Sequence, residues 1–335
     1  MTSPTRTPTP ADLRKRRRLP ANYALKRSAH AVSLTTGRLT AAGRMLPGFL
    51  IVGAQRCGTT SLYRALAQHP LVLKPVLRKG VHYFDVAYHR GPAWYQAHFP
   101  LRTTAARLRR RYGHRPLAFE SSPYYLFHPL ATPRIAWDLP GVKLIVLVRD
   151  PVERAYSAHA HELARGFERE PSFERAVQME EERLAGEAER LCAAPHSISH
   201  AHRHHAYLAR GRYAEQLSRL ELLVGRDRVL VLDSHRFFAD PEATFDRVLA
   251  FLGLPHLGPP PSSTGTTPAP GRTPCARVCA DASPSTSSHG TNCSSPTSAR
   301  SRHGAADHLP PACRVEGKGR DVHVNGDRGR DDKRS

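Results

Sequence analysis

Residues 49–61 read FLIVGAQRCGTTS, an apolar run followed by a glycine-containing turn and three consecutive hydroxyl side chains. The run predicts a buried strand, and Thr59, Thr60 and Ser61 would open the helix that follows it. Gly58 accepts backbone angles that other residues resist, so the turn can direct its N–H groups toward a ligand. Because a helix amino terminus carries partial positive charge, the stretch predicts a cradle for an anion.

The spacing is close to that of the nucleoside-triphosphate loop G-x-x-x-x-G-K-[ST], but Thr59 stands in place of the lysine. The nearest cation in the sequence is Arg56, inside the loop. Triphosphate chemistry needs the loop lysine, a hydroxyl on Mg²⁺ and usually a carboxylate at a neighbouring strand end. A P-loop kinase of a small metabolite is therefore kept as an alternative, and a site for a different phosphate is favoured.

A second buried strand is predicted at 142–150, VKLIVLVRD, and Arg149 lies at its carboxyl end. Asp150 is placed to cap the next helix, with Glu153 at the capping-box position. Ser157 lies two turns into that helix, so Arg149 and Ser157 form a predicted second anion pocket. Two anion pockets at two strand ends imply a ligand that is phosphorylated at two separated points.

Strand-like runs alternate with helical patterns through the middle of the chain. The third apolar run is DRVLVLD, at 227–233. Helical patterns cover 151–165, 172–190, 213–223 and 241–252. This alternation predicts right-handed β–α–β crossovers and therefore an α/β fold, a P-loop-like and mostly parallel sheet flanked by helices in a single domain.

Composition divides the 335-residue chain into three zones. Residues 1–47 hold ten Lys and Arg against one acid, which predicts a basic disordered arm with weak contact to anionic surfaces. Residues 48–258 form the predicted domain. Residues 259–335 are poor in large apolar side chains and predict a low-complexity, disordered tail, or the product of a shifted reading frame. A formal charge of +21 favours anionic partners, so a basic nucleic-acid-binding protein is a further alternative.

Neither a membrane-spanning run nor the apolar core of a signal peptide is present in the sequence, so a cytoplasmic protein is expected. Cys57 and Cys192 are isolated and predict no disulfide framework. Cys275 and Cys279 resemble half of a zinc site, but no matched pair follows them. Histidines at 196–205 have the spacing of one helix face, yet no acidic or cysteine ligand joins them in the sequence. A polar linker is favoured there, and no metal is predicted.

Several segments, in order, resemble the sulfotransferases that use 3′-phosphoadenosine-5′-phosphosulfate (PAPS), especially the glycan-modifying branch and its bacterial relatives. FLIVGAQRCGTTSLYRAL is similar to that family's 5′-phosphosulfate loop, and LIVLVRDPVERAYSAHAHE to its 3′-phosphate motif. The other similar segments are HYFD (82–85), GPAWYQAHFP (91–100), FESSPYYL (119–126), RGRYAEQL (210–217) and the stretch at 229–255.

The resemblance implies sulfuryl transfer from PAPS, as co-substrate, to a hydroxyl or amine of a glycan, a glycolipid or a small metabolite. It assigns the 3′-phosphate to Arg149 and Ser157, and Arg56 to charge stabilisation during transfer. No metal is required. The loop residues expected to bind the 5′-phosphosulfate are Arg56, Cys57, Gly58, Thr59, Thr60 and Ser61.

The acceptor's proton needs a base, and here the sequence departs from the glycan-modifying branch. That branch commonly carries a Glu just before the H-[FY]-F-D segment, where this chain has Gly80. His82 or Glu120 is predicted to act as the base instead, or the enzyme is slow or inactive. A packing role for His82 beside Tyr83 and Phe84 stays open.

Other polar and aromatic residues carry two interpretations each. Stacking on a sugar or packing in the core is expected of Trp94, Tyr95, Tyr124 and Tyr125. His159 and His161 are expected to line the acceptor cleft or to face solvent. The acidic run at 180–182 predicts a solvated helix face.

Overall fold

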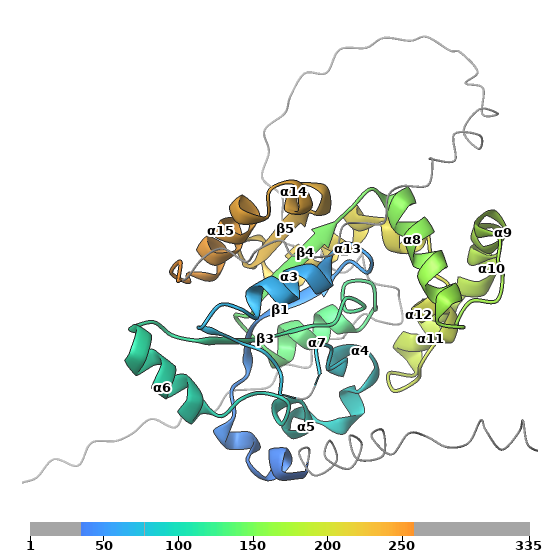
Figure 1. Cartoon of the computed structure of the whole chain (residues 1–335). Coiled ribbons are helices and arrows are strands. Elements are labelled where there is room, and N and C mark those ends of the chain that lie inside the picture. Colours follow the sequence, from blue (N-terminus) through green and yellow to red (C-terminus); the bar gives the residue numbers. More distant parts are fainter. Residues whose placement is uncertain (1–34, 77, 258–335) are drawn as a thin grey trace, which may run out of the picture.

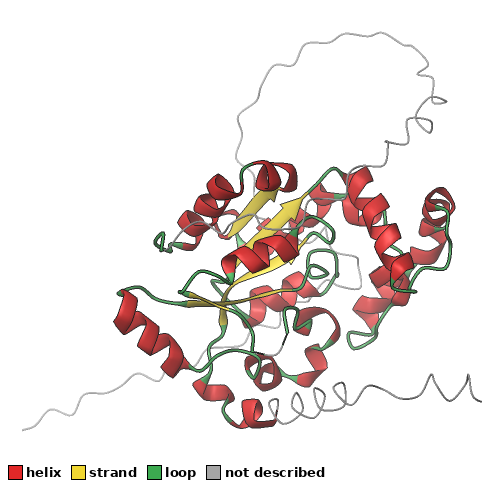
Figure 2. Ribbon diagram, viewed as in Figure 1, coloured by secondary structure: helices red, strands yellow, loops and turns green. Residues whose placement is uncertain are grey.

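The computed structural model describes residues 35–76 and 78–257 (Figure 1). Within them, one sheet has the strand order β2-β3-β1-β4-β5, and every pairing is parallel. The strands are β1 (Pro47–Gly53), β2 (Val72–Leu73), β3 (Leu117–Ser121), β4 (Lys143–Val148) and β5 (Val229–Asp233). The predicted α/β fold is confirmed, and Figure 2 shows the strands at the centre with helices around them.

Helices connect the strands and cover the sheet. They are α3 (Thr59–Leu66), α4 (Tyr83–Val86), α5 (Pro92–Gln96), α6 (Arg102–Tyr112), α7 (Ala131–Asp138), α8 (Pro151–Ala164), α9 (Phe173–Gln178), α10 (Glu180–Leu184), α11 (Glu187–Ala193), α12 (His200–His204), α13 (Tyr213–Val224), α14 (Ser234–Ala239) and α15 (Pro241–Leu252). Short 3-10 turns lie at Ala41–Gly43, Tyr88–Arg90, Ala209–Gly211 and Arg226–Arg228.

The order of the strands places the reversal of the chain's direction across the sheet between β1 and β4. From β1 the chain moves outward to β2, and from β3 it crosses β1 to reach β4 and then β5. Right-handed crossovers in opposite directions put their helices on opposite faces of the sheet. In Figure 1 α3 crosses in front of the strands, whereas α7 and α13 pack on each other. Ligands of such sheets bind beyond the carboxyl ends of the strands at this reversal point.

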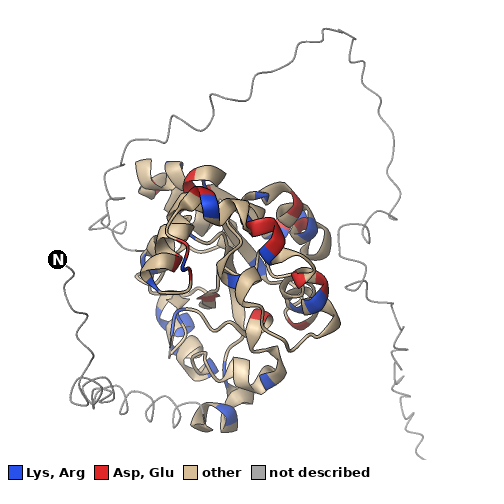
Figure 3. Ribbon diagram, turned by 90° about the vertical axis from the view of Figure 1, so that its right-hand side faces the viewer, with Lys and Arg blue, Asp and Glu red and all other residues tan. Residues whose placement is uncertain are grey.

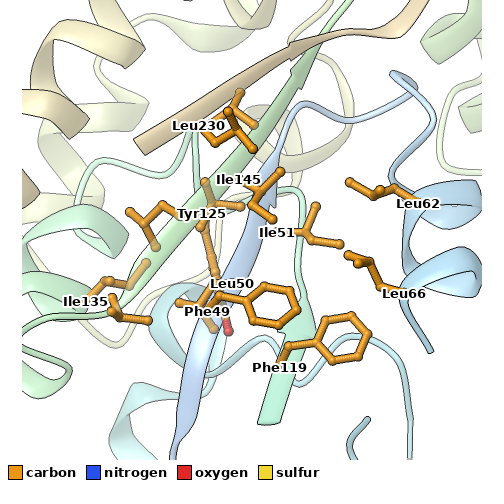
Figure 4. Close-up of a cluster of buried hydrophobic side chains, with 14 of the residues drawn as sticks. Phe49, Leu50, Ile51, Leu62, Leu66, Phe119, Tyr125, Ile135, Ile145 and Leu230 are labelled. Carbon is orange, nitrogen blue, oxygen red and sulfur yellow. The ribbon is translucent and has the colours of Figure 1, made fainter. Parts of the chain in front are cut away.

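The core lies on both faces of β1. Figure 4 shows Leu62 and Leu66 of α3 directed to the side of β1 that carries Ile51, while Tyr125 and Ile135 lie on the other side. None of these five side chains is more than 1% exposed. Each aliphatic side chain buried in this way stabilises the fold by about 1.5–3 kcal/mol. This packing fixes the loop after β1, because the loop connects a buried strand to a helix whose inner face is buried.

Asp150 caps the helix after β4, as predicted. The second hydrogen bond of the predicted capping box, in which Glu153 would accept from the backbone at the cap, is wrong. Asp150 Oδ1 accepts hydrogen bonds from the backbone N–H groups of Val152 and Glu153, at 3.0 and 2.9 Å. The carboxylate of Glu153 instead accepts from Arg149, with 2.6 Å between Oε2 and one terminal guanidinium nitrogen. A charged partner at the strand end competes for Glu153, because an ion pair is stronger than a bond to a neutral backbone N–H.

The single helix predicted at 172–190 is wrong, because the chain forms three short helices, α9, α10 and α11. Gly186, with φ of 70°, is in the left-handed region and interrupts the pattern between α10 and α11. Glu180, at the start of α10, accepts hydrogen bonds from the N–H groups of Leu208 and Ala209, at 2.7 and 2.8 Å. Tertiary hydrogen bonds therefore override the local helical periodicity.

The predicted arm up to residue 34, the predicted tail from residue 259 and the pair Cys275 and Cys279 lie outside the described residues. Within the part of the chain that the structure describes, no helix has the length and apolar character that a bilayer crossing requires.

Candidate active site

The loop between β1 and α3 presents unused hydrogen-bond donors at the carboxyl edge of the sheet. Gly58 has φ of 87°, and a Cβ there would lie 3.0 Å from the Phe238 ring. No described residue accepts a hydrogen bond from the N–H groups of Gly58, Thr59 or Thr60. Unpaired N–H groups at the amino terminus of an eight-residue helix are the donors that an anion needs.

Arg56 extends from this loop to the helix that follows β4. Its backbone has φ of 70°, and its Nε donates a hydrogen bond to Ser157 Oγ at 3.1 Å. Burial, and then the charge of Arg149, lowers the pKa of Arg56. The structure thus brings Arg56, Arg149 and Ser157 together from two strand ends that are far apart in the sequence.

Two guanidinium groups, those of Arg56 and Arg149, lie near enough at this end of the sheet for their charges to interact. Their partial neutralisation comes from Glu153, on Arg149, and from the nearby Glu162. The side chain of Glu153 is 62% exposed, so an exchange of its ion pair for a ligand anion costs little. A phosphate is therefore a suitable partner for Arg149.

His82 lies at the amino end of α4 and forms a pair with Asp85. His82 Nδ1 and Asp85 Oδ2 are 2.7 Å apart, and the carboxylate is completely enclosed. Burial alone would raise the pKa of Asp85, but the charge of His82 and its hydrogen bond leave the pKa lowered. An ionised carboxylate only accepts, so Nδ1 carries a proton, and once the ring is neutral its Nε2 is an acceptor. This geometry suits a general base.

Gly80 explains how the ring reaches this position. A Cβ at residue 80 would lie 3.2 Å from His82 Nε2 and 3.2 Å from the carbonyl oxygen of Ser121. The imidazole nitrogen therefore occupies space that a side chain at residue 80 would need. His82 adopts φ of 57°, which holds the ring over that space.

Glu120 is fully buried and has no free oxygen for an acceptor. It accepts hydrogen bonds from Tyr95 Oη and Tyr125 Oη, at 2.9 and 2.8 Å, and from Val81 N and Ser122 Oγ. Burial raises its pKa. This environment favours a positioning role, since Glu120 fixes the backbone directly before His82. Both oxygens of Glu120 already accept hydrogen bonds, and its interpretation as the base stays a prediction.

Sugar stacking finds no support for the four predicted aromatic residues. All four are buried and pack in the interior: Trp94, Tyr95, Tyr124 and Tyr125. Cys57 is likewise buried, with its Sγ 3.7 Å from Tyr213 Oη, and burial raises the pKa of its thiol. Thr59 is 5% exposed, whereas Thr60 is exposed and Ser61 is half-buried. The accessible hydroxyls of the cradle are therefore those of Thr60 and Ser61.

The segment predicted as a polar linker is a packed helix, α12. His202 is 4% exposed and its Nδ1 lies 2.8 Å from Tyr124 Oη. His204 Nδ1 lies 2.9 Å from a carboxylate oxygen of Glu162, an acidic partner that the sequence did not reveal. His159, predicted to face the cleft or solvent, is buried against the carbonyl of Glu170. Partners that are distant in the sequence therefore decide whether each of these histidines is buried and which groups it contacts.

Lys79 is a functional candidate that the sequence did not indicate. Its Nζ lies 2.7 Å from Thr60 Oγ1, in the first turn of α3. It belongs to an irregular segment between β2 and α4, where neither periodicity nor motif spacing could place it.

A cavity of about 940 Å³ lies away from these residues, at the amino ends of the strands. Pro47, Leu117 and Lys143, the first residues of β1, β3 and β4, line it. Because the predicted site residues all lie at the carboxyl ends, this cavity is not part of the candidate active site.

The geometry gathers anion-binding groups at the carboxyl ends of a parallel sheet, and sequence comparison assigns the family of the chain. A family model described as "Sulfotransferase domain" matches residues 46–261. The chain belongs to this family.

The chain is similar to two heparan sulfate enzymes and to one sulfotransferase of solved structure. Bifunctional heparan sulfate N-deacetylase/N-sulfotransferase 3 of Homo sapiens is 30% identical over 232 residues, which cover 63% of this chain and 23% of that protein. Heparan sulfate glucosamine 3-O-sulfotransferase 6 of Mus musculus is 29% identical over 257 residues, 76% of this chain and 63% of the relative. The matches thus span less than two thirds of either relative. A solved sulfotransferase from Alicyclobacillus acidocaldarius is 31% identical, covers 67% of this chain and 87% of its own, and has a TM-score of 0.46.

Proposed function

We propose that the chain transfers the sulfuryl group of PAPS to a hydroxyl or amine of a glycan. One observation carries the proposal: at the reversal point of the sheet, Arg56 donates to Ser157 Oγ and lies near enough to Arg149 for the charge of Arg149 to lower its pKa, beside the unpaired N–H groups of the α3 amino terminus. Such a site suits a ligand with two separated anionic groups, which PAPS has. A glycan acceptor is supported by the heparan sulfate enzymes among the relatives.

Each residue has one task in this scheme. Thr60, Ser61 and the loop N–H groups hold the 5′-phosphosulfate, and Arg149 with Ser157 holds the 3′-phosphate. The acceptor oxygen forms a bond to sulfur while the bond between sulfur and the 5′-phosphate oxygen breaks, and that phosphate oxygen keeps the electron pair. His82 Nε2 takes the acceptor's proton. Arg56 stabilises the charge on the leaving phosphate but retains its own proton.

Binding of the product nucleotide tests the proposal without knowledge of the acceptor. Calorimetric titration with adenosine 3′,5′-bisphosphate should show one site, and Arg149→Ala should weaken it about 10- to 100-fold, as expected for charge-assisted bonds to a phosphate. Arg226→Ala, at a surface arginine paired with Glu221, is the matched control and should leave the affinity unchanged. Absence of binding by the unaltered chain would overturn the proposal.

A further inference from the structure

We propose that Lys79 is a second cation of the phosphosulfate cradle and hydrogen-bonds the phosphate oxygen that leaves sulfur. The inference rests on the proposed function above and adds to it a residue that no sequence motif marks. It follows from where the ammonium group lies and from what it lacks.

The ammonium group lies at the mouth of the cradle. Lys79 Nζ is 2.7 Å from Thr60 Oγ1, and Thr60 also carries one of the unpaired N–H groups of α3. An ammonium has three donors, and Thr60 takes one of them. The other two have no hydrogen-bond partner among the described residues, so they are available to a ligand oxygen beside the helix terminus.

No carboxylate compensates this charge. Among the described residues, no Asp or Glu forms an ion pair with Lys79, and its closest aromatic contact is the Tyr63 ring, whose centroid lies 5.6 Å from Nζ. Burial, and then the charge of Arg64, lowers the pKa of Lys79 to about 8. A cation that is partly desolvated next to a second cation is an unfavourable way to anchor a loop. An anion at the cradle would offset that cost.

The segment that carries Lys79 also carries the predicted base. Lys79 precedes Gly80 and lies three residues before His82, and its carbonyl accepts a hydrogen bond of 3.4 Å from the N–H of Ser121 at the end of β3. Ser121 Oγ is buried beside it without a hydrogen-bond partner among the described residues. Because Gly80 has no side chain, the segment can present a cation and an imidazole to the same reacting group from its two ends.

Lys79 would act on the leaving group of the transfer step. The acceptor's proton passes to His82 Nε2, a bond forms between the acceptor oxygen and sulfur, and the bond between sulfur and the phosphate oxygen breaks. The phosphate oxygen gains a full negative charge, and Lys79 donates a hydrogen bond to it without losing its proton. Arg56 and Lys79 would thus share the charge of the leaving group.

Two ligands separate this role from a structural one. Lys79→Met should weaken adenosine 3′,5′-bisphosphate about 10-fold and leave the affinity for adenosine 3′-monophosphate, which has no 5′-phosphate, unchanged. Arg149→Ala should weaken both ligands. Lys74→Met, at an exposed lysine of the same segment, is the control and should weaken neither. Equal losses for the two ligands with Lys79→Met, or no loss, would overturn the proposal.

The pH dependence gives a second and independent readout. The affinity of the unaltered chain for the bisphosphate should fall above pH 8 as free Lys79 loses its proton. Lys79→Arg should remove this fall, since arginine stays charged. If the unaltered chain does not bind the bisphosphate at any pH, the proposed function itself fails. If the unaltered chain and Lys79→Arg both bind the bisphosphate and their affinities depend on pH in the same way, only the role of Lys79 fails.

Discussion

Two groups of charged residues in this protein differ in whether their charges are already paired. The first, here called the donor edge, consists of Arg56, Lys79, His82 and Arg149 at the carboxyl ends of the strands. The second, the carboxylate cluster, consists of Glu162, Glu168 and Glu180 under helices α8 to α12. Figure 3 faces the helices of the second group and shows acidic and basic residues interspersed along them.

In the carboxylate cluster each buried acid finds its donors inside the chain. Glu168 is 3% exposed and accepts from Arg183, from Tyr207 Oη at 2.8 Å and from two backbone N–H groups. These partners lower its pKa to about 2, although burial alone would raise it. The cluster is closed, which is the pattern of a structural network.

At the donor edge the charges are only partly paired. Lys79 has no acidic partner among the described residues, and the partner of Arg149 is an exposed carboxylate. A contact joins the two groups, because Gln55 in the loop donates from Nε2 to Glu162 at 3.0 Å. A perturbed pKa therefore marks a ligand site only where the chain leaves the charge of that same group without a partner.

The largest expected effect is at the donor edge. His82→Asn should lower kcat about 10²- to 10⁴-fold, because it removes Nε2 as the base. An asparagine amide can replace Nδ1 as the donor to Asp85, and asparagine tolerates the positive φ of this position. Single-turnover transfer of labelled sulfate from PAPS measures the loss.

The melting temperature and the affinity for adenosine 3′,5′-bisphosphate serve as controls for His82→Asn, and both should stay near those of the unaltered chain. Activity that persists in a folded His82→Asn variant would remove His82 from the mechanism.

The next effect belongs to the carboxylate cluster and concerns stability. Glu168→Gln should lower the free energy of unfolding by about 3 kcal/mol, since it leaves Arg183 without its buried partner. For a domain of this size the melting temperature should fall by roughly 6–12 °C. Calorimetric melting measures this, with the exposed Glu181→Gln as the matched control.

Affinity for the bisphosphate should not change in Glu168→Gln. A variant that binds the nucleotide much more weakly but melts normally would show that the two groups are not distinct.

The acid side of the stability curve should depend on the same carboxylate. Glu168 has a pKa of about 2 in the folded state against an ordinary 4.5, so it stabilises the fold fully above pH 4.5. That stabilisation is lost as the pH falls from 4.5 toward 2. Urea unfolding at pH 5, 4 and 3 should therefore show the unaltered chain and Glu168→Gln converging in stability. A constant difference across this range would contradict the assignment.

The smallest expected effect concerns the ion pair between Arg149 and Glu153 at the donor edge. Glu153→Gln removes the exposed partner of Arg149, and affinity for the bisphosphate should rise about 2- to 5-fold because the ligand no longer competes with an ion pair. Titration at low and high salt measures it, and the gain should shrink at high salt. A loss of affinity would mean that Glu153 orients Arg149 for the ligand.

Much of this architecture follows from local patterns. The run at 49–52 and the run at 144–148 are apolar throughout, as strands buried on both faces must be, and Asp150 caps its helix through bonds that span only three residues. The sequence from Gly53 to Ser61 predicts a turn followed by a helix, because a glycine, hydroxyl side chains and a helix start are consecutive in it.

Other features depend on residues that are distant in the sequence. The helix predicted at 172–190 is divided, with Glu180 held by backbone N–H groups more than 25 residues away. Glu120 was expected to reach an acceptor, and the hydroxyls of Tyr95 and Tyr125 enclose it instead. No periodicity in one segment encodes which partner another segment will bring.

Local patterns predicted β1, β4 and β5 and the helices α3 and α8 that follow the first two, because apolar period, glycine position and capping act over a few residues, whereas β2 and β3 were not predicted as strands. Only the tertiary structure decided that Lys79 meets Thr60, that His82 Nε2 fills the space beside Gly80 and that His204 meets Glu162. The contacts of Lys79 and His204 join residues 19 and 42 positions apart, so the packing of separate segments sets these distances, and the sequence around either partner carries no sign of them.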